Sequence, residues 1–487
     1  MVSRKRMLKV LEKGDIDLMH GATVEVLEKV GVFVNSDSAL QLLADNGFAV
    51  DKGKKIVKMT ESQVVDAVKR CKKNFRWHAR SERYSVDAVD GRTKIGPGAQ
   101  CLYYIDPETG KVRPPTLEDG ITICRLLEAL PSASIAYVPV QLSDIPEEYN
   151  FIVQMAAGAI HTGKLTFGGN GRAHFDITLR LAEALLGDME EVRKKPMFAG
   201  YVDPISPLAH DEAMLETMLL YAKWGFPVFI TVMALGGGTA PASLAGLLVQ
   251  QNAEVLSAIA IAACVAKSLK VVYGCVSCPL DMRSGMAATG SPEASLIGVG
   301  AVQMAKYYGL PSNMGVQSDS KTVDAQTSYE KAQAALVAML AGADFSDLFL
   351  GSTEAFSAWS PVQAVIDDEI AARASRIADG IEVDGETISV DVITKTGPMG
   401  NFLKNIETLR QFRREHLSPR LSDRASRAGW NSAGAKEMRQ RAKERMIELL
   451  NSYSPEPLET EVRKSIDSLL KEYTKSIGAD VLEKRSS

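Results

Sequence analysis

Short apolar segments typical of β-strands recur along this chain, and each is followed by a stretch with helical spacing. Polar, glycine or proline residues separate the two parts of every unit. Repeated strand–loop–helix units predict a parallel sheet with helices on its outside. With at least seven such units, the simplest architecture is an α/β fold of the (β/α)8 TIM barrel type. The predicted strands are residues 135–140, 165–168, 198–202, 228–232, 271–276, 313–316 and 348–350.

Residues that directly follow these strands are the first candidates for a functional site, because barrels carry their active sites at the carboxyl ends of the strands. They are Gln141, Gly169, Asn170, Asp203, Pro204 and residues 234–238, 277–279, 317–319 and 351–353.

Three regions are expected along the chain. Residues 1–92 form an N-terminal helical extension, in which Thr60 and Gln63 have the spacing of a helix capping box. Residues 93–396 form the catalytic barrel, and either residues 94–106 or residues 388–393 supply its eighth strand. Residues 397–487 form a C-terminal helical region that packs on the barrel. Its dense charges are typical of solvated helix faces, with contacts to a partner or another subunit as the alternative.

Composition excludes several classes of protein. The net charge of −4 leaves no basic excess for nucleic acid, and the apolar content of 46% is ordinary for a soluble protein. The basic N-terminus lacks the apolar stretch of a signal peptide, and no apolar window is expected to span a membrane. Six cysteines at this length fit a reducing compartment. We therefore expect a cytoplasmic protein that binds neither nucleic acid nor membrane.

A glycine-rich loop, Gly236, Gly237 and Gly238, precedes a long apolar helix. Backbone amides in such a loop, together with a helix N-terminus, favour an anion such as a carboxylate or phosphate. A tight turn between strand and helix is the alternative.

Cys275 and Cys278 have the spacing of metal ligands. A single such pair is weak evidence, because a zinc site needs further ligands. We expect no metal and regard both residues as structural, with a zinc site as the alternative.

Charged and aromatic residues gather around the predicted mouth of the barrel, where loops build the pocket. The charged and polar group comprises Asp281, Arg283, Ser318, Asp319, Lys321 and Asp324. The aromatic group comprises Tyr103, Tyr104, Tyr201, Phe349, Phe356 and Trp359. Aromatic faces are suited to a quaternary ammonium, whose methyl groups donate no strong hydrogen bonds.

Ordered motifs across nearly the whole chain resemble the trimethylamine methyltransferase (MttB) superfamily. They are LYYIDPETGKVRPPTLEDG at 102–120, GGGTAPASLAGLLVQQNAEVL at 236–256, YGCVSCPLDMRSGMAATGSPE from 273, AKYYGLPSNMGVQSDSKTVDAQTSYEKAQAALVAMLAGAD from 305, VQAVIDDEIA from 362 and HLSPRLSDRASRAGW at 416–430.

The resemblance implies an enzyme that moves a methyl group from an amine to the Co(I) of a corrinoid (cobalamin) held on a separate protein. Members that use trimethylamine carry pyrrolysine, whereas this chain has only standard residues, including 318–330. It therefore resembles the non-pyrrolysine members, such as glycine betaine methyltransferases. The partners implied are a quaternary amine and a cognate corrinoid protein, with no tightly bound cofactor, and we expect a homo-oligomer.

Site roles follow as hypotheses. Asp319 and Arg283 are the catalytic candidates, and either Arg283 or the backbone amides at 236–238 hold a substrate carboxylate. The candidates for substrate binding are Tyr103, Tyr104, Gln141, Tyr201, Gly236, Gly237, Lys321, Phe356 and Trp359. Asn170 and Ser318 are the candidates for contacts with the corrinoid.

Other functions remain open at this point. The same chemistry on proline betaine, carnitine or γ-butyrobetaine differs only in substrate bulk. A zinc-dependent methyltransferase or a metal- or phosphate-dependent lyase would use the same fold. A non-catalytic binder of quaternary amines is the third class.

Overall fold

The computed structural model describes residues 8–98, 100–453, 455–474 and 482. Its centre is a sheet of seven strands in which every neighbouring pair is parallel. In sheet order the strands are β6 (Lys94–Ile95), β17 (Phe345–Ser346), β16 (Ser312–Met314), β14 (Lys270–Cys275), β12 (Pro227–Val232), β10 (Phe198–Val202) and β9 (Thr166–Phe167).

The two edges of this sheet are connected through the segment that precedes Tyr137. Isolated parallel bridges join Ala133 to Ile95 of β6 and Ile135 to Leu165 beside β9. The predicted strand 135–140 therefore pairs only at single residues. The fold is thus α/β, with a strongly curved parallel sheet in the form of a half-barrel.

The structure corrects one strand prediction and decides between two alternatives for another. The last predicted strand, 348–350, is wrong, because the strand in this unit is β17 and ends before Asp347. Of the two candidates for an additional strand, residues 94–106 supply β6, which pairs with β17. Residues 388–393 form no strand, since helix α13 (Val390–Thr396) begins within them.

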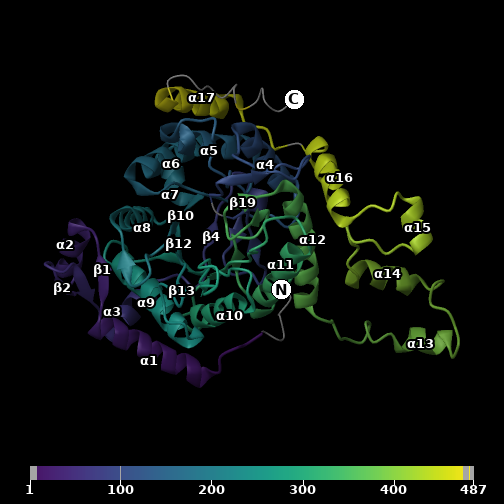
Figure 1. The fold of residues 1–487 in the computed structure, drawn as a ribbon, viewed down its shortest axis with the longest axis horizontal. Helices are drawn as coiled ribbons and strands as arrows, with labels where there is room; N and C mark the ends of the chain where they lie inside the picture. The colour runs from purple at the N-terminus through teal and green to yellow at the C-terminus, as the bar shows by residue number, and fades with distance from the viewer. Residues whose placement is uncertain (1–7, 99, 454, 475–481, 483–487) are drawn as a thin grey trace.

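Helices surround the sheet on its outer side (Figure 1). They are α4 (Leu117–Ala129), α5 (Glu147–His161), α6 (Gly171–Leu186), α7 (Met189–Lys194), α8 (Glu212–Trp224), α9 (Leu244–Ala263), α10 (Pro292–Tyr307), α11 (Ala325–Ala341) and α12 (Pro361–Asp379). A capping box between Thr116 and Asp119 fixes the start of α4.

Helix α9 is the most apolar of these helices. Its length and composition would allow it to cross a membrane, which the sequence reading did not expect, but 72% of its apolar window is buried inside the protein. It packs on β12 and β14 and is covered on the other side by α1 (Lys13–Lys29) and α3 (Glu61–Lys69). A helix that is covered all round has no polar face to keep in water, which explains its composition.

The N-terminal extension is less helical than predicted. Between α1 and α3 lie α2 (Asp37–Asp45) and a small sheet, and the predicted capping box of Thr60 and Gln63 is present at α3. The strands of the small sheet, in order, are β11 (Ala209–His210), β1 (Val32–Val34), β3 (Ile56–Lys58) and β2 (Ala49–Asp51). A hairpin of β4 (Arg76–Trp77) and β5 (Val86–Asp87), with a 3-10 turn at Glu82–Tyr84 between them, follows α3.

Two further small sheets lie beyond the carboxyl ends of the central strands. One has the order β18 (Ser352–Thr353), β19 (Ala358–Trp359), β7 (Tyr103–Ile105) and β8 (Val112–Arg113). The other pairs β13 (Leu235–Gly236) with β15 (Cys278–Pro279). Both are built from loops that follow central strands, so they form the rim around the carboxyl end.

The C-terminal region contains α14 (Ile406–Glu415), α15 (Arg427–Ser432), α16 (Met438–Asn451) and α17 (Thr460–Thr474). Helix α16 buries Ala442, Met446 and Leu449 and packs on α12 and α4. Helix α17 packs on α5 and α6. Helices α13, α14 and α15 stand away from the ring of helices (Figure 1).

A buried ion pair joins α11 to α12. Lys331 Nζ lies 2.7 Å from Asp367 Oδ2, and neither side chain is exposed. Asp367 also accepts the backbone N–H of Gly351, and Lys331 donates to the carbonyl of Phe349. The pair therefore fixes the loop that follows β17.

Lys331→Met is expected to destabilise the protein by about 3–5 kcal/mol, because it leaves the Asp367 carboxylate buried without its cation. Denaturant unfolding measures the effect. Lys69→Met, at an exposed pair, is the control and should change stability by less than about 0.5 kcal/mol. An equally small effect of Lys331→Met would mean that Asp367 is not charged in the folded protein.

Candidate active site

The inner face of the curved sheet begins with an apolar layer. Side chains of a strand alternate between its two faces, so residues two apart share the inner face. Ile135, Leu165, Ala199, Phe229, Val272 and Phe345 form this buried layer together with Trp77. The Trp77 ring from β4 lies 5.5 Å from the Phe229 ring and 6.0 Å from the Phe345 ring, and its indole N–H donates to the carbonyl of Met197. The N-terminal extension thus closes the amino end of the inner face.

Toward the carboxyl ends of the strands the inner face becomes polar. Tyr137, Tyr201, Thr231 and Asp347 each lie two residues beyond a member of the apolar layer and so continue on the same face. Together with residues from the neighbouring strands they form what we call the polar cluster: Tyr137, Tyr201, Asp203, Thr231, Asn313 and Asp347.

Asp347 is the most deeply buried charge of the polar cluster, with no exposed surface. Burial raises its pKa from 3.8 to about 7, and the nearby Asn313 and Tyr201 side chains only partly offset this effect. Neither carboxylate oxygen has a hydrogen-bond partner among the described residues. A buried, unpaired carboxylate is costly, which makes this position a candidate for function rather than for stability.

Asp203 is the second acid of the cluster and directly follows β10. It is exposed to solvent, unlike Asp347, but the protein atoms packed around its carboxyl and the negative charge of Asp347 raise its pKa from 3.8 to about 7. No basic side chain contributes to the pKa of either carboxyl. At neutral pH the pair therefore carries negative charge that no cation among the described residues neutralises.

Other polar atoms of the cluster also lack partners. The Tyr201 hydroxyl, the Thr231 hydroxyl and the Asn313 amide nitrogen are buried and make no hydrogen bond within the described residues. Gly274 lies beside Thr231, and a Cβ there would come within 2.2 Å of the Thr231 hydroxyl. Buried polar groups are normally satisfied, so a group of unsatisfied ones indicates a place for a ligand or water.

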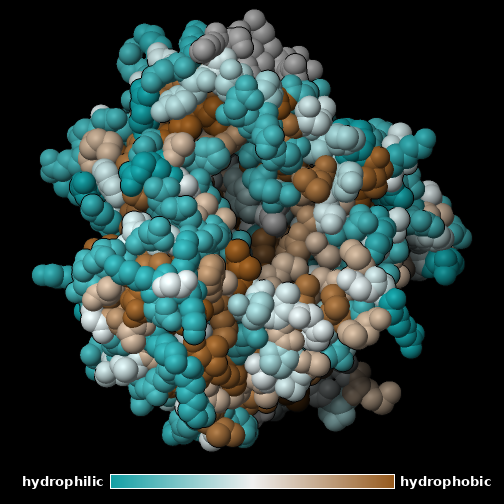
Figure 2. Space-filling model, turned by 60° about the vertical axis from the view of Figure 1, so that its left-hand side comes forward, coloured by the Kyte–Doolittle hydropathy of each residue, from teal (hydrophilic) through white to brown (hydrophobic). Residues whose placement is uncertain are grey.

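Aromatic rings form one wall beside these carboxylates. The Phe167 ring lies 5.8 Å from the Tyr137 ring and 5.4 Å from the Tyr201 ring, both edge-on. The Tyr201 ring also stacks on Phe229 at 6.2 Å. Aromatic faces next to carboxylates are suited to an organic cation. From the side, the molecule has a hollow near its centre with hydrophobic side chains along one edge, whereas most of the surrounding surface is hydrophilic (Figure 2).

Comparisons with known proteins agree along nearly the full length of the chain. The family model described as trimethylamine methyltransferase (MTTB) matches residues 1–478. Glycine betaine methyltransferase of Desulfitobacterium hafniense (strain Y51) is 32% identical over 478 residues, which cover 97% of this chain and 98% of the relative. Trimethylamine methyltransferase MttB of Methanosarcina thermophila is 33% identical, over 95% of this chain and 96% of the relative.

The chain belongs to the trimethylamine methyltransferase (MttB) family. It is a methyltransferase, as the resemblance of its motifs predicted. The crystal structure of the Methanosarcina barkeri monomethylamine methyltransferase (MtmB) aligns with a TM-score of 0.53 and 14% identity, over 92% of this chain and 90% of that chain. At this identity the likeness concerns the fold alone.

Of the residues predicted from the sequence, Tyr201 lies in the polar cluster of this MttB-family protein. Tyr104 and Trp359 lie side by side in the rim sheet, both fully buried. The Arg113 guanidinium covers the Tyr104 ring at 4.8 Å, and the Trp359 indole donates to the carbonyl of Pro97. Their rings are thus engaged in packing, while Tyr103 of the same sheet is exposed.

Asp319 lies on the rim and is held by hydrogen bonds. It accepts the hydroxyl and N–H of Thr289 and the N–H of Gly290, at 2.7–3.1 Å. Ser318 is buried and donates to Glu330. Lys321 is exposed and donates to the carbonyl of Asp319. The segment that begins at Ser318, which contains only standard residues, is therefore a tightly bonded loop that leads into α11.

The loop after β17 is bonded to this segment. Glu354, Ala355 and Phe356 all have positive φ, at 51°, 48° and 72°, a strained conformation for residues with a side chain. The N–H groups of Glu354 and Ala355 donate to the carbonyls of Ser320 and Ser318. Phe356 lines a small pocket at the carboxyl ends of β14 and β16, outside the polar cluster.

The remaining predicted residues lie on loops of the rim. Arg283 is exposed, and only its backbone N–H has a hydrogen-bond partner among the described residues, the Asp281 carboxylate. The N–H groups of Gly237 and Gly238, after Gly236, donate to carbonyls of their own loop. Gln141 is half-buried, and its backbone N–H donates a hydrogen bond to the carbonyl of Cys101. Asn170 is an exposed residue at the start of α6.

Cys275 and Cys278 are buried thiols. Burial raises the pKa of Cys275 to about 11 and that of Cys278 to about 12, so both are protonated at neutral pH. Cys275 donates to the amide oxygen of Gln251 at 3.0 Å. The described residues contain no group of three or more His, Cys, Asp or Glu arranged to hold a metal. These contacts suit structural cysteines better than zinc ligands.

Sequence reasoning missed most of the polar cluster. Asp203 stood among the residues that follow predicted strands but was not selected. Asp347 was missed because the strand of its unit was predicted at 348–350, after this residue and not before it. Tyr137 and Asn313 fell inside predicted strands, where alternation gives no sign of which face contains the site. A correct end for β17 would have placed Asp347 on the candidate list.

Asp347→Asn is expected to raise the melting temperature more at pH 8 than at pH 5. Between its ordinary value of 3.8 and its folded pKa of about 7, the folded protein binds a proton that the unfolded chain lacks. The stability of the native protein therefore falls as pH rises through this window and stays low above it, by up to about 4 kcal/mol for one isolated carboxyl. An uncharged amide removes this loss.

Thermal unfolding of the native and variant proteins at both pH values measures the difference. Asp281→Asn, at an exposed carboxylate whose pKa is lowered by backbone hydrogen bonds, is the control and should give no gain at pH 8. A variant that melts lower than the native protein at pH 8 would show that the Asp347 carboxylate has a stabilising partner.

Proposed function

We propose that this enzyme transfers a methyl group from a quaternary amine, with glycine betaine as the first candidate, to the Co(I) of a corrinoid carried by a separate protein. The observation that supports the proposal is a pair of carboxylates, the buried Asp347 and the solvent-exposed Asp203, beside aromatic rings and without a basic side chain. A cationic substrate supplies the missing positive charge. The relative named glycine betaine methyltransferase, aligned over nearly its whole length, supports the choice of substrate.

The charge of the substrate decides which groups the enzyme needs. A quaternary nitrogen already carries its positive charge, so a neutral tertiary amine leaves without a proton from a general acid. The Co(I) centre supplies the nucleophile that accepts the methyl group. The chain then contributes binding and orientation, which alone can lower a barrier by several kcal/mol.

Each member of the polar cluster has a role in this proposal. The carboxylates of Asp203 and Asp347 neutralise the ammonium, and the rings of Tyr137, Phe167 and Tyr201 contact its methyl groups. The Asn313 amide and Thr231 hydroxyl have free hydrogen-bonding capacity to fix the rest of the substrate. A carboxylate of the substrate faces away from the two acids, toward the rim, where Arg283 and Lys321 are exposed.

We also infer that the sheet closes into a (β/α)8 barrel through residues 133–135. The isolated bridges to Ile95 and Leu165 support this closure, because they lie on opposite edges of the seven-stranded sheet. The division into an N-terminal extension, a barrel at 93–396 and a C-terminal helical region accompanies this proposal, as does a location in the cytoplasm.

Turnover with a panel of amines tests the function. Methylcobalamin formation from Co(I) cobalamin is followed by absorbance, with glycine betaine, proline betaine, carnitine, γ-butyrobetaine and trimethylamine supplied separately. We expect turnover with a quaternary amine and little or none with trimethylamine. In Asp347→Asn, kcat/KM should fall at least about tenfold, equal to roughly 1.4 kcal/mol of lost transition-state binding. Activity that is highest with trimethylamine would contradict the proposal.

Arg283→Ala tests the orientation of the substrate. If Arg283 binds the substrate carboxylate at the rim, the variant should raise the KM for glycine betaine about three- to tenfold and leave kcat nearly unchanged. Lys194→Ala, an exposed cation on α7, is the control. An unchanged kcat/KM would remove Arg283 from the site and leave the assignment of the polar cluster intact.

A further inference from the structure

Residues 381–419 form an arm that leaves the body of the protein after α12 and returns to the same helix. The arm contains α13 and α14, and Figure 1 shows both helices away from the ring around the sheet. The structure describes every residue of the arm, and none in α13 or α14 is buried. Isolated helices of this length are marginal in water, so the arm needs contacts that this single chain does not supply.

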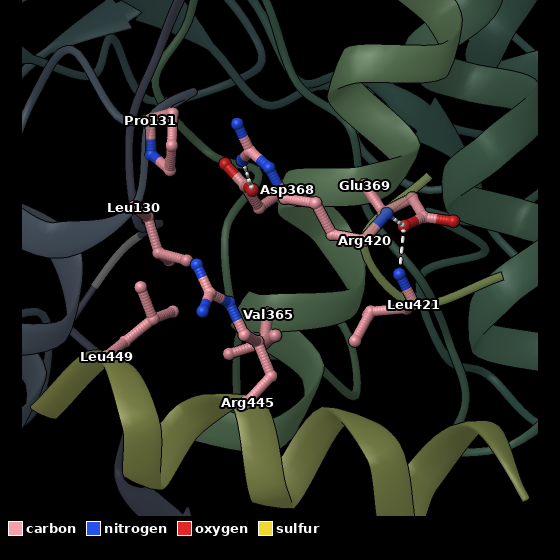
Figure 3. A pocket seen from close by; sticks show the side chains of 9 residues that line it. All are labelled: Leu130, Pro131, Val365, Asp368, Glu369, Arg420, Leu421, Arg445 and Leu449. Carbon is pink, nitrogen blue, oxygen red and sulfur yellow. Dashed lines mark hydrogen bonds and ion pairs between the residues drawn. The ribbon is translucent and has the colours of Figure 1, made fainter. Parts of the chain in front are cut away.

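Both ends of the arm are fixed to α12. Arg376 donates to the carbonyls of Gly380, where the arm leaves, and Glu415, near its return. Beyond the arm, Arg420 pairs with Asp368 at 2.8 Å. Glu369 accepts the N–H of Leu421 in the same place, beside Leu130 and Leu449 of the body (Figure 3). The arm is therefore a clamped projection and not a loose loop.

Charges inside the arm neutralise one another. Arg410 pairs with Glu386 at 2.7 Å, and Arg414 pairs with Glu382 at 2.7 Å. These pairs connect α14 to the segment before α13 and give the arm a defined shape. They also leave little net charge to attract a charged partner.

The surface that the arm exposes is apolar. Eleven of its large apolar side chains are exposed by 44% or more: Ile381, Val383, Ile388, Val390, Ile393, Met399, Phe402, Leu403, Ile406, Leu409 and Phe412. Ile406, Leu409 and Phe412 share one side of α14 by their spacing. At roughly 150 Å² for each large side chain, these fractions amount to on the order of 1,000 Å² of apolar surface. A stable protein interface needs about 800 Å² per partner, so the arm is large enough for one.

We propose that the arm binds a second copy of this chain and is the main contact of a homo-oligomer. Permanent interfaces between subunits are large and apolar, whereas interfaces with partners that come and go are smaller and more polar. A corrinoid protein must dissociate after each methyl transfer, and its acceptor has to reach the rim of the sheet. This comparison with the corrinoid protein rests on the proposed function; the need to cover the arm does not.

Light scattering coupled to size-exclusion chromatography tests the proposal on the full-length chain without any corrinoid protein. The native protein should have at least twice the mass of the chain at micromolar concentration. The double variant Ile406→Glu, Leu409→Glu should be a monomer, or should associate at least tenfold more weakly, because each charge would be buried in the interface. Circular dichroism should show an unchanged body, since neither residue contacts the core.

Leu18→Glu, at a residue of α1 that is 75% exposed, is the matched control and should keep the native mass. A native protein that is monomeric, or an oligomer that the double variant leaves intact, would overturn the proposal. A chain that stays monomeric alone and associates through the arm only when the corrinoid protein is added would also overturn the proposal. None of these results depends on turnover, so failure of the proposed function would be recognised separately in the amine panel.

Discussion

Two carboxylates without a cation, one buried and one exposed to solvent, determine what this site can do. Asp203 and Asp347 lie at the carboxyl ends of β10 and β17. Burial raises the pKa of Asp347 to about 7, and the protein atoms around the Asp203 carboxyl together with the charge of Asp347 raise the pKa of Asp203. The rest of the protein has to tolerate this cost, since an unpaired buried charge lowers stability. The buried pair of Lys331 and Asp367 fixes the loop directly after Asp347, so the acid has a defined position. A cation that enters the site recovers the electrostatic cost as binding energy.

The aromatic and apolar layers beneath the acids make this arrangement effective. Trp77 closes the amino end of the inner face and supports Phe229, which in turn stacks on Tyr201. Water is thereby kept from one side of the carboxylates, and in low dielectric their attraction for an organic cation is stronger. The N-terminal extension thus contributes to the site through packing, although none of its residues belongs to the polar cluster.

Much of the central sheet could be predicted from the sequence, because buried parallel strands are continuous apolar runs. The strand at 198–202 matches β10 residue for residue, and 228–232 lies within β12. The prediction of a strand at 348–350 was wrong for the same reason. These residues are apolar because they pack in the core after the strand has ended. The sequence does not show in which direction a side chain points, so Tyr104 and Trp359 were as plausible for the site as Tyr201. The family, in contrast, was identified from ordered motifs, which do not depend on strand ends.

The arm illustrates a limit of a different kind. Sequence patterns place apolar residues on helices but do not say which chain covers them, and the charged C-terminal region was expected to pack on its own barrel. Helices α16 and α17 do pack on the body, whereas α13 and α14 bury nothing. The two parts differ in where they lie. Helix α16 packs along α12 and α4, whereas the arm, fixed at its ends by Arg376 and Arg420, projects away from the body (Figure 1). A projection held outward at both ends is positioned to contact another molecule, and its neutralised charges and apolar side chains favour a permanent contact over a transient one.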